Sequence, residues 1–275
     1  MNKTVYIFGH KNPDTDSAVS ATAYAMLKQL QGFSNYKAAR AGHFNPQTDY
    51  IYKKFNVTSP KYMSNLTPKV EYYMQDTCDV VQEDESVWAA LGKMQNSQLR
   101  ALPVVDKEGH YKSLLHYSAF AQQLLLVLNP ELQTNISTSI GLIIRTMNAQ
   151  PLVVHNQEDI FKASILVGAA SDETFTQMLN AHSSENLIVI TSDRESIYRQ
   201  CIEQKVRLLI ITSGYMLDKE LKDMAQKNGV SVIMSPYTTS DTVMMIAYST
   251  PVSIMADAEI QAVQPEDTIF RIRQI

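Results

Sequence analysis

The sequence predicts an α/β protein with parallel sheets and more than one module. Three observations indicate this. A strand-like run, a tight loop and a long helical segment follow one another at the amino end, and apolar runs alternate with helical segments over residues 129–248. An eight-residue segment that starts at Val81 also recurs 182 positions later. A chain of 275 residues is long enough for two or more modest domains, each with its own core.

The first element is the strand predicted for Val5 to Phe8. Four β-favouring apolar residues precede Gly9, and the Asn12-Pro13 pair is a typical breaker before a helical run. Residues 1–66 are therefore expected to open a βαβ layer that is too small to form a domain alone. The elements expected there are strands at 5–8 and 36–41 and helices at 18–30 and 48–55.

The loop after this strand carries the candidate chemistry. His10, Asp14 and Asp16 lie within seven residues on one strand-to-helix turn, so their side chains can converge on one or two divalent cations. Imidazole and carboxylate ligands without a thiolate suit Mn²⁺, Mg²⁺, Zn²⁺ or Fe²⁺. Two alternatives stay open: Asp16 or Ser17 is also typical of a helix N-cap, and a phosphate could lie at the helix N-terminus.

The motif Gly-His-Lys-Asn-Pro-Asp-Thr-Asp-Ser at residues 9–17 closely resembles the first motif of the family II, manganese-dependent inorganic pyrophosphatases of the DHH phosphoesterase superfamily. The resemblance implies that His10, Asp14 and Asp16 bind metal. It also implies two or three Mn²⁺ or Co²⁺ ions that activate water, with Mg²⁺ accompanying the substrate. One departure is Gln47, which stands where the family usually has Glu. The match continues through residues 23–25, 42–48 and 50–55.

The repeat starts the next part of the chain. Residues 81–88 recur as 263–270, and both copies predict a short extended segment followed by an acidic helix start capped by Ser86 or Thr268. Together with residues 100–106 and 111–120, the first copy resembles a CBS domain, a module that pairs with a second copy to bind adenine nucleotides. The ligands that this resemblance implies are Arg100, Pro103, Ser113 and His116. Because Ala119 stands where the family has Asp, a purely structural role is the alternative.

Residues 191–195 and 211–214 resemble the two signatures of a DRTGG domain, with Ser213 in place of the usual first Gly. The resemblance implies dimer contacts and a part in binding diadenosine polyphosphates. The alternative is that Asp193-Arg194 is a helix cap beside a solvated cation. A parallel sheet is expected. Its strands are expected at 152–154, 165–167, 187–190, 208–211 and 230–234, with helices at 172–181 and 218–227.

These resemblances divide the chain into four regions. The expected division is an N-terminal fragment of a DHH catalytic domain at 1–66, a first CBS domain at 67–128, a DRTGG domain at 129–248 and the start of a second CBS domain at 249–275. The further Asp ligand and the Asp-His-His triplet of the family are not found, and His110, His116, His155 and His182 stand singly. We therefore expect a C-terminally truncated pyrophosphatase with little activity by itself.

The expected function is manganese-dependent hydrolysis of pyrophosphate to two phosphates, regulated by adenine nucleotides or diadenosine polyphosphates, in a homodimer. The alternatives are a catalytically inert adenine-nucleotide sensor and a phosphoesterase that acts on nucleotides or short oligonucleotides. A net charge of −4 without a basic cluster argues against nucleic acid. Cys78 and Cys201 lie far apart, which favours a reducing, cytoplasmic setting, and the apolar runs are too short to span a membrane.

Overall fold

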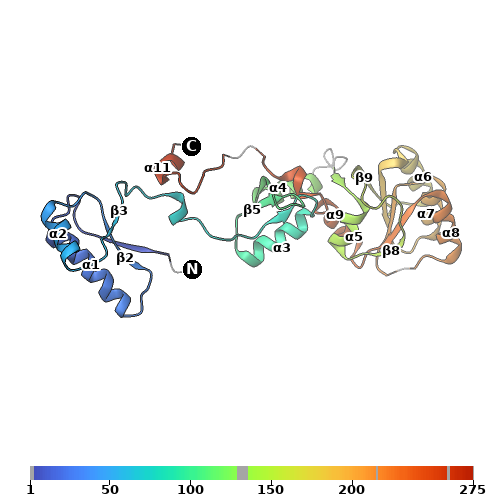
Figure 1. The fold of residues 1–275 in the computed structure, drawn as a ribbon. Helices are drawn as coiled ribbons and strands as arrows, with labels where there is room; N and C mark the ends of the chain where they lie inside the picture. The colour runs from blue at the N-terminus through green and yellow to red at the C-terminus, as the bar shows by residue number, and fades with distance from the viewer. Residues whose placement is uncertain (1–2, 129–135, 215, 259–260, 275) are drawn as a thin grey trace. The chain divides into compact units, whose positions relative to one another are not determined.

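The computed structural model describes residues 3–128, 136–214, 216–258 and 261–274. The chain forms two compact units (Figure 1). Unit 1 contains residues 1–76 and 261–275, and unit 2 contains residues 77–260. Among the described residues, no helix is long and apolar enough to cross a membrane. Along the sequence, the segment that forms unit 2 thus lies between the two segments that form unit 1.

Unit 1 is built on a three-stranded parallel sheet in the order β1-β2-β3. Helix α1 packs on the sheet through a stripe of small residues, which lets the helix approach β2 closely. Ala18, Ala21, Ala25 and Ala39 are all at least 96% buried. This arrangement confirms the predicted βαβ opening. The elements are β1 (Val5–Phe8), α1 (Thr15–Leu30), β2 (Tyr36–Arg40), α2 (Pro46–Lys54) and β3 (Lys61–Tyr62).

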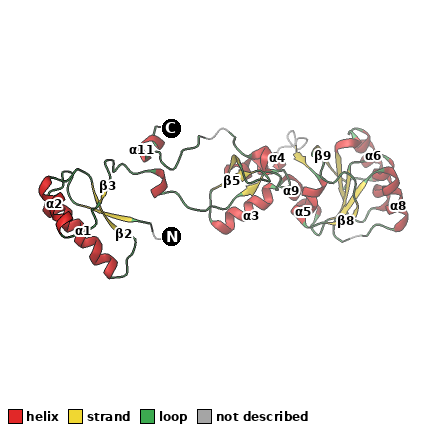
Figure 2. Cartoon of the chain, viewed as in Figure 1, coloured by secondary structure: helices red, strands yellow, loops and turns green. Residues whose placement is uncertain are grey.

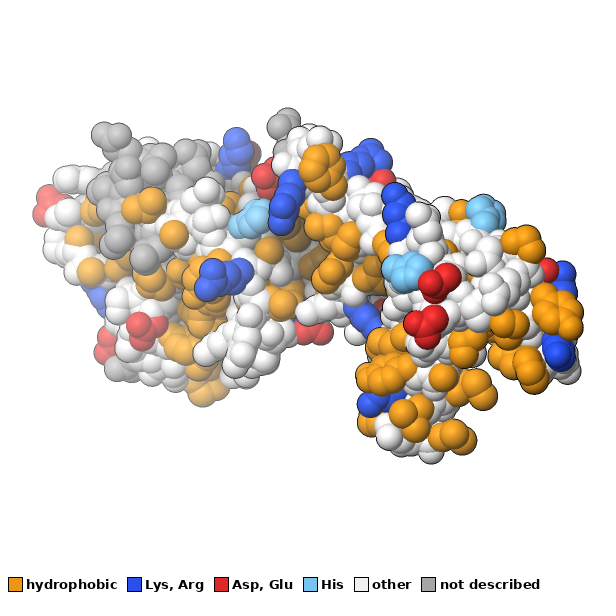
Figure 3. All heavy atoms as spheres, turned by 90° about the vertical axis from the view of Figure 1, so that its left-hand side faces the viewer, with side chains coloured by type: hydrophobic (Ala, Val, Ile, Leu, Met, Phe, Trp, Pro, Cys, Tyr) orange, Lys and Arg blue, Asp and Glu red, His pale blue; other side chains and the backbone are white. Residues whose placement is uncertain are grey.

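Much of the apolar surface of unit 1 stays exposed. Hydrophobic side chains gather on the face of unit 1 that Figure 3 turns to the viewer. An apolar groove of about 430 Å³ lies between α1 and α2, and exposed Met26 and Phe55 are part of it. The other residues of the groove are Val19, Thr22, Ala23, Ile51, Tyr52 and Val57.

The first part of unit 2 is a small sheet with two helices. Strand β4 pairs with β5 in parallel, and β5 pairs with β6 as an antiparallel hairpin. The elements are β4 (Val81–Gln82), α3 (Val87–Ser97), β5 (Ala101–Val105), β6 (Tyr111–His116) and α4 (Ser118–Leu128). Their shared core includes Val87, Met94, Leu102 and Leu115, and it is completed by Val252 from a distant part of the chain.

The rest of unit 2 is a six-stranded sheet between two layers of helices, drawn in yellow and red in Figure 2. Helices α6, α7 and α8 pack on one face, and α5 and α9 pack on the other. The strand order is β7-β9-β10-β11-β12-β8. The strands are β7 (Ile136–Thr138), β8 (Gln150–Val153), β9 (Phe161–Val167), β10 (Leu187–Thr191), β11 (Leu208–Ile211) and β12 (Ser231–Met234). The helices are α5 (Ile140–Met147), α6 (Asp172–Asn180), α7 (Glu195–Glu203), α8 (Lys219–Asn228) and α9 (Thr239–Ala247).

The prediction of a parallel sheet is correct for the four central strands and wrong for the two edges. Strands β9 to β12 are parallel, whereas β7 and β8 pair antiparallel. Strands β10 and β11 are buried at every residue, as expected for parallel strands covered on both faces. The edge strands are shorter or only partly buried, and their direction depends on pairing that the local sequence does not encode. The predicted boundary at 128 and 129 falls at the start of a segment outside the described residues.

The internal repeat has a structural counterpart in both units. Ser86 caps α3 by accepting from the Ala89 amide at 3.2 Å, and Thr268 caps α11 (Ile269–Ile272) by accepting from the Arg271 amide at 3.4 Å. The acidic residues before each cap also match, since Glu85 and Asp267 accept from the amides of Gln82 and Gln264. The caps predicted for the two copies are confirmed.

Each copy of the repeat is completed by a helical turn that belongs to the other copy. In unit 2, α10 (Val252–Met255) lies against residues 83–87 of the first copy. In unit 1, the short helix η1 (Val70–Tyr72) lies against residues 265–269 of the second copy. In unit 2, the Val87, Val252 and Ser253 amides donate to the Thr250, Glu85 and Glu83 carbonyls at 2.9, 2.8 and 3.1 Å. In unit 1, the Ile269, Val70 and Glu71 amides donate to the Pro68, Asp267 and Pro265 carbonyls at 2.9, 2.9 and 3.0 Å.

Every hydrogen bond of one set has its counterpart in the other set at a displacement of 182 positions. An isolated antiparallel bridge between Ser86 and Pro251 likewise corresponds to one between Thr268 and Lys69. The repeated unit is therefore longer than the eight-residue motif and spans about residues 68–88 and 250–270. We call this arrangement the reciprocal exchange.

Candidate functional site

The loop that joins β1 to α1 is held by two hydrogen bonds to Ser17. The Ser17 amide donates to Asp14 Oδ1 at 2.9 Å, so Asp14 is the N-cap of α1. The His10 amide donates to Ser17 Oγ at the same distance. The prediction that Asp16 or Ser17 could be the cap is wrong, because the helix begins two residues earlier than a cap at Asp16 requires and three residues earlier than a cap at Ser17 requires.

Gly9 is needed for this loop to close. A Cβ atom at this position would lie 1.8 Å from Ser17 Oγ. Any residue other than glycine at position 9 would therefore displace the Ser17 hydroxyl. The close approach of Gly9 and Ser17 fixes the end of β1 against the first turn of α1. His10 and Asp14 are thereby placed on the same side of the loop.

The structure brings together two of the three predicted metal ligands. His10 Nε2 lies 3.3 Å from Asp14 Oδ1, and both side chains are more than half exposed. Asp16 lies in the first turn of α1, where its carboxylate accepts a long bond of 3.5 Å from Ser20 Oγ. The ligand atoms of His10, Asp14 and Asp16 do not all lie within 4.8 Å of one another, so metal binding by this set stays a prediction.

The charge of Asp14 is suited to a cation. The backbone hydrogen bond from Ser17 lowers the pKa of the Asp14 carboxyl, and the neighbouring His10 lowers it further. Asp14 therefore stays ionised well into the acidic range. One imidazole nitrogen and one ionised carboxylate, both open to solvent, fit a divalent cation such as Mn²⁺.

The four residues predicted for an adenine nucleotide are not brought together. On the β5–β6 hairpin, Val104 pairs with Ser113 on the core face, where both are buried. Pro103 and His116 lie at alternate positions and therefore on the opposite face. Arg100 precedes β5 and lines a pocket of about 540 Å³ between α3 and Tyr117. Nucleotide binding by these four residues stays a prediction, and Ser113 is the member that the fold directs inward.

A second group of ligand types lies in the β5–β6 turn. Asp106, Glu108 and His110 each offer one atom within 4.8 Å of the others. Sequence analysis did not single out this group, although Asp-x-Glu-x-His is a spacing that could have revealed it. The Asp106 carboxylate already accepts from the Glu108 and His110 amides at 3.1 and 2.8 Å and lies 3.1 Å from Lys112 Nζ. These contacts close the hairpin, which accounts for the carboxylate without a metal.

The Asp106 contacts predict acid sensitivity of unit 2. The backbone hydrogen bond from His110, aided by Lys112, lowers the pKa of Asp106 from 3.8 to about 2. Stability gained from the lowered pKa is present above about pH 4 and is lost as the pH falls toward 2. The urea midpoint of Asp106→Asn should thus be lower than that of the wild type at pH 6, and the two midpoints should become equal near pH 2. The single tryptophan, Trp88, reports on this unit, and Asp84→Asn is the control. A constant difference across this range would contradict the prediction.

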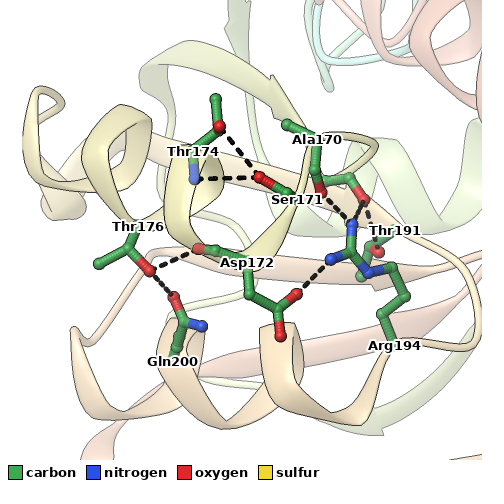
Figure 4. Close-up of polar contacts among 9 residues, drawn as sticks. Ala170, Ser171, Asp172, Thr174, Thr176, Thr191, Arg194 and Gln200 are labelled. Atoms are coloured by element: carbon green, nitrogen blue, oxygen red, sulfur yellow. Dashed lines mark hydrogen bonds and ion pairs between the residues drawn. The ribbon is translucent and has the colours of Figure 1, made fainter.

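The first of the two DRTGG-like signatures, residues 191–195, is built around Arg194 (Figure 4). Its guanidinium donates to the Gly168 carbonyl at 3.3 Å, to the Ala170 carbonyl and to the Asp172 carboxylate. The side chain is only 27% exposed, so the solvated cation that sequence analysis allowed is wrong. Arg194 occupies the N-cap position of α7 but makes no capping bond, and it fastens the loop between β9 and α6 instead.

Arg194→Met should lower the free energy of unfolding of unit 2 by about 1.5 kcal/mol, because three carbonyl and carboxylate acceptors lose a charged donor. Arg199→Met on the same helix is the matched control. Arg199 is 41% exposed and pairs with Glu220 at the surface, where such pairs contribute little. Urea unfolding followed by circular dichroism would measure both variants. Equal destabilisation of the two would contradict the structural role of Arg194.

Comparison with known proteins identifies the modules of unit 2. Models of the CBS domain and of the DRTGG domain match residues 70–125 and 142–249, respectively. The crystal structure of the CBS and DRTGG domains of the regulatory region of Clostridium perfringens pyrophosphatase, complexed with its activator diadenosine tetraphosphate, is similar with a TM-score of 0.66 and 26% identity. The similarity covers 75% of this chain and 88% of that one. The chain thus has a mixed α/β fold that carries CBS and DRTGG domains.

The whole chain is also similar to longer enzymes. It is 29% identical over 274 residues, 99% of its length, to a cobalt-dependent inorganic pyrophosphatase of Clostridium perfringens. It is 22% identical over 287 residues to a probable manganese-dependent inorganic pyrophosphatase of Thermotoga maritima, a match that covers 98% of this chain. The chain spans 49% of the length of each of these relatives. It is therefore homologous to cobalt- and manganese-dependent inorganic pyrophosphatases.

Proposed function

We propose that this chain supplies the first metal ligands and the nucleotide-sensing region of a Mn²⁺- or Co²⁺-dependent inorganic pyrophosphatase of the DHH superfamily. The observation that carries the proposal is the convergence of His10 and Asp14 at the end of β1, within 3.3 Å, in a chain homologous to such enzymes. Asp16 is the third proposed ligand. The substrate is pyrophosphate, with Mg²⁺ accompanying it.

When bound, the divalent cations would polarise pyrophosphate and lower the pKa of bound water so that hydroxide forms near neutral pH. The residues of this chain hold and orient the ligands. Ser17 fixes the Asp14 carboxylate through its amide and the His10 backbone through its hydroxyl. Each ion needs several protein donors. We therefore propose that the remaining ligands come from a part of the enzyme that corresponds to the half of the relatives that this chain does not span.

The regulatory part of the proposal concerns unit 2. We propose that its CBS and DRTGG domains bind adenine nucleotides or diadenosine polyphosphates and mediate a homodimer. Diadenosine tetraphosphate is the activator bound by the similar Clostridium perfringens region. The described cysteines, Cys78 and Cys201, are both free, and we propose a reducing, cytoplasmic setting.

The test is phosphate release from pyrophosphate with Mn²⁺ or Co²⁺. The protein would be this chain continued by the part of the Clostridium perfringens relative that lies beyond the match. Metal-dependent release that disappears in His10→Ala is expected, whereas residues 1–275 alone should release little phosphate. Release unaffected by His10→Ala would rule out the assignment of the metal site.

A second candidate is a catalytically inert sensor of adenine nucleotides. It is favoured by the similarity of three quarters of the chain to a region that holds a diadenosine ligand. Calorimetry of residues 1–275 with AMP, ADP and diadenosine tetraphosphate would test binding. Heat of binding together with an inactive continued protein would favour the sensor over the enzyme.

A further inference from the structure

The amino ends of α1 and α2 are joined by a pair of hydroxyl groups. Thr15 Oγ1 and Thr48 Oγ1 lie 2.9 Å apart and share a hydrogen bond. Thr48 is fully buried, so its side of this bond is shielded from water. The Thr48 amide donates to Asn45 Oδ1 at 2.7 Å, which makes Asn45 the N-cap of α2. The bond therefore ties the first residue of α1 to a buried position in the capped first turn of α2.

Thr15 stands between two of the proposed metal ligands. Asp14 and Asp16 are its neighbours in the chain, and each is joined to it by a planar peptide group, so a shift of Thr15 moves the backbone of both. The Asp14 carboxylate is also held by the Ser17 amide at 2.9 Å. The Asp16 carboxylate accepts a long bond of 3.5 Å from Ser20 Oγ. The position of the Asp16 carboxylate therefore depends more on its backbone than that of Asp14 does.

The segment that leads from β2 into α2 also supports the middle of the β1–α1 loop. A Cβ atom at Gly42 would lie 2.6 Å from the Lys11 carbonyl oxygen and 2.8 Å from Pro13 Cδ, so the backbone of this segment lies directly against the loop. The Arg40 guanidinium donates to the Gly42 carbonyl at 2.7 Å and holds this turn. Residues 40–48 thus meet the loop at two points, and the Thr48 contact is the one at the start of α1.

We propose that Thr48 is a positioning residue of the metal site, because its hydroxyl acts through Thr15 to hold Asp14 and Asp16 in place for a divalent cation. This inference rests on the proposed function. Ligands that are already held near their bound positions bind an ion more tightly, since less conformational entropy is lost when the ion arrives. The bond between the two hydroxyl groups therefore contributes to metal affinity, in addition to any contribution to the stability of unit 1.

Two substitutions break this bond from opposite sides. Thr48→Val removes the buried hydroxyl and keeps the branched shape, and Thr48→Ser is the variant that keeps the hydroxyl. Thr15→Val removes the partner, which is only partly buried, so it tests the inference even where Thr48→Val does not fold. The matched control is Thr22→Val, because Thr22 Oγ1 lies 2.6 Å from the Tyr52 hydroxyl. This second hydroxyl pair joins the same two helices about two turns beyond Thr15.

The experiment measures the Mn²⁺ affinity of residues 1–275 by calorimetry, with circular dichroism to establish that each variant is folded at the temperature of the titration. Thr48→Val and Thr15→Val should each bind Mn²⁺ about ten-fold more weakly than the wild type, at the low end of the loss found when a partner of a metal ligand is removed. The double variant should lose no more than either single variant, because all three lack the same bond. Thr48→Ser and Thr22→Val should bind Mn²⁺ like the wild type.

The wild-type titration distinguishes this inference from the proposed function. If the wild type does not bind Mn²⁺, the proposed function and the inference are both overturned. If the wild type binds Mn²⁺ and folded Thr15→Val or Thr48→Val binds it equally well, the inference alone is overturned. It is also overturned if Thr22→Val or Thr48→Ser loses as much Mn²⁺ affinity as Thr48→Val, or if the two single losses multiply in the double variant.

Discussion

Asp14→Asn should bind Mn²⁺ about 10- to 100-fold more weakly than the wild type while unfolding at nearly the same temperature. The carboxylate has two functions that this substitution separates. Asparagine caps helices as well as aspartate does, so the Ser17 amide keeps its acceptor. The neutral amide cannot match the negative charge that lies 3.3 Å from His10 Nε2. Calorimetric titration with Mn²⁺ and thermal unfolding by circular dichroism measure the two effects.

Two controls make this result specific. Asp14→Ala removes the charge and the cap, so it should lose the same Mn²⁺ affinity and also about 1 kcal/mol of stability. Asp49→Asn removes an exposed carboxylate of α2 in the same unit and should leave Mn²⁺ affinity unchanged. Wild-type Mn²⁺ affinity in Asp14→Asn would show that this carboxylate is only a helix cap.

The sequence allowed the prediction of the His10 loop but not of its internal geometry. Three neighbouring residues, Asp14, Asp16 and Ser17, are all good N-caps by residue type. The choice among them depends on the contact of Gly9 with Ser17, which exists only after β1 and α1 have packed. For the same reason the close pair of His10 and Asp14 is visible only in the folded loop.

Pairing between distant segments explains the other differences. The repeat was predictable because its evidence is sequence similarity, whereas the reciprocal exchange depends on contacts between residues more than 160 positions apart. The inward direction of Ser113 follows from its register opposite Val104, and a one-residue shift would have turned it outward. The sequence leaves a solvated cation open for Arg194 because its acceptors at Gly168, Ala170 and Asp172 lie more than 20 residues away.

The reciprocal exchange gives a second large effect, at Val252. Val252→Ala should lower the free energy of unfolding of unit 2 by about 2 to 3 kcal/mol, since two buried methyl groups are lost and a cavity remains. Val70→Ala, at the equivalent position of unit 1, should cost less than about 1 kcal/mol because Val70 is only partly buried. The two substitutions are chemically identical and occupy matched backbone positions.

Each unit offers its own place for a fluorescent reporter in urea unfolding. Trp88 donates its amide to the Tyr248 carbonyl at 3.0 Å and reports on the exchange in unit 2. Its equivalent in unit 1 is Phe270, so Phe270→Trp in a Trp88→Phe background moves the reporter to the half of the exchange in unit 1. A large effect of Val252→Ala on Trp88 and a small effect of Val70→Ala on the moved reporter are expected. Equal effects would contradict the prediction, because Val252 is fully buried and Val70 is only partly buried.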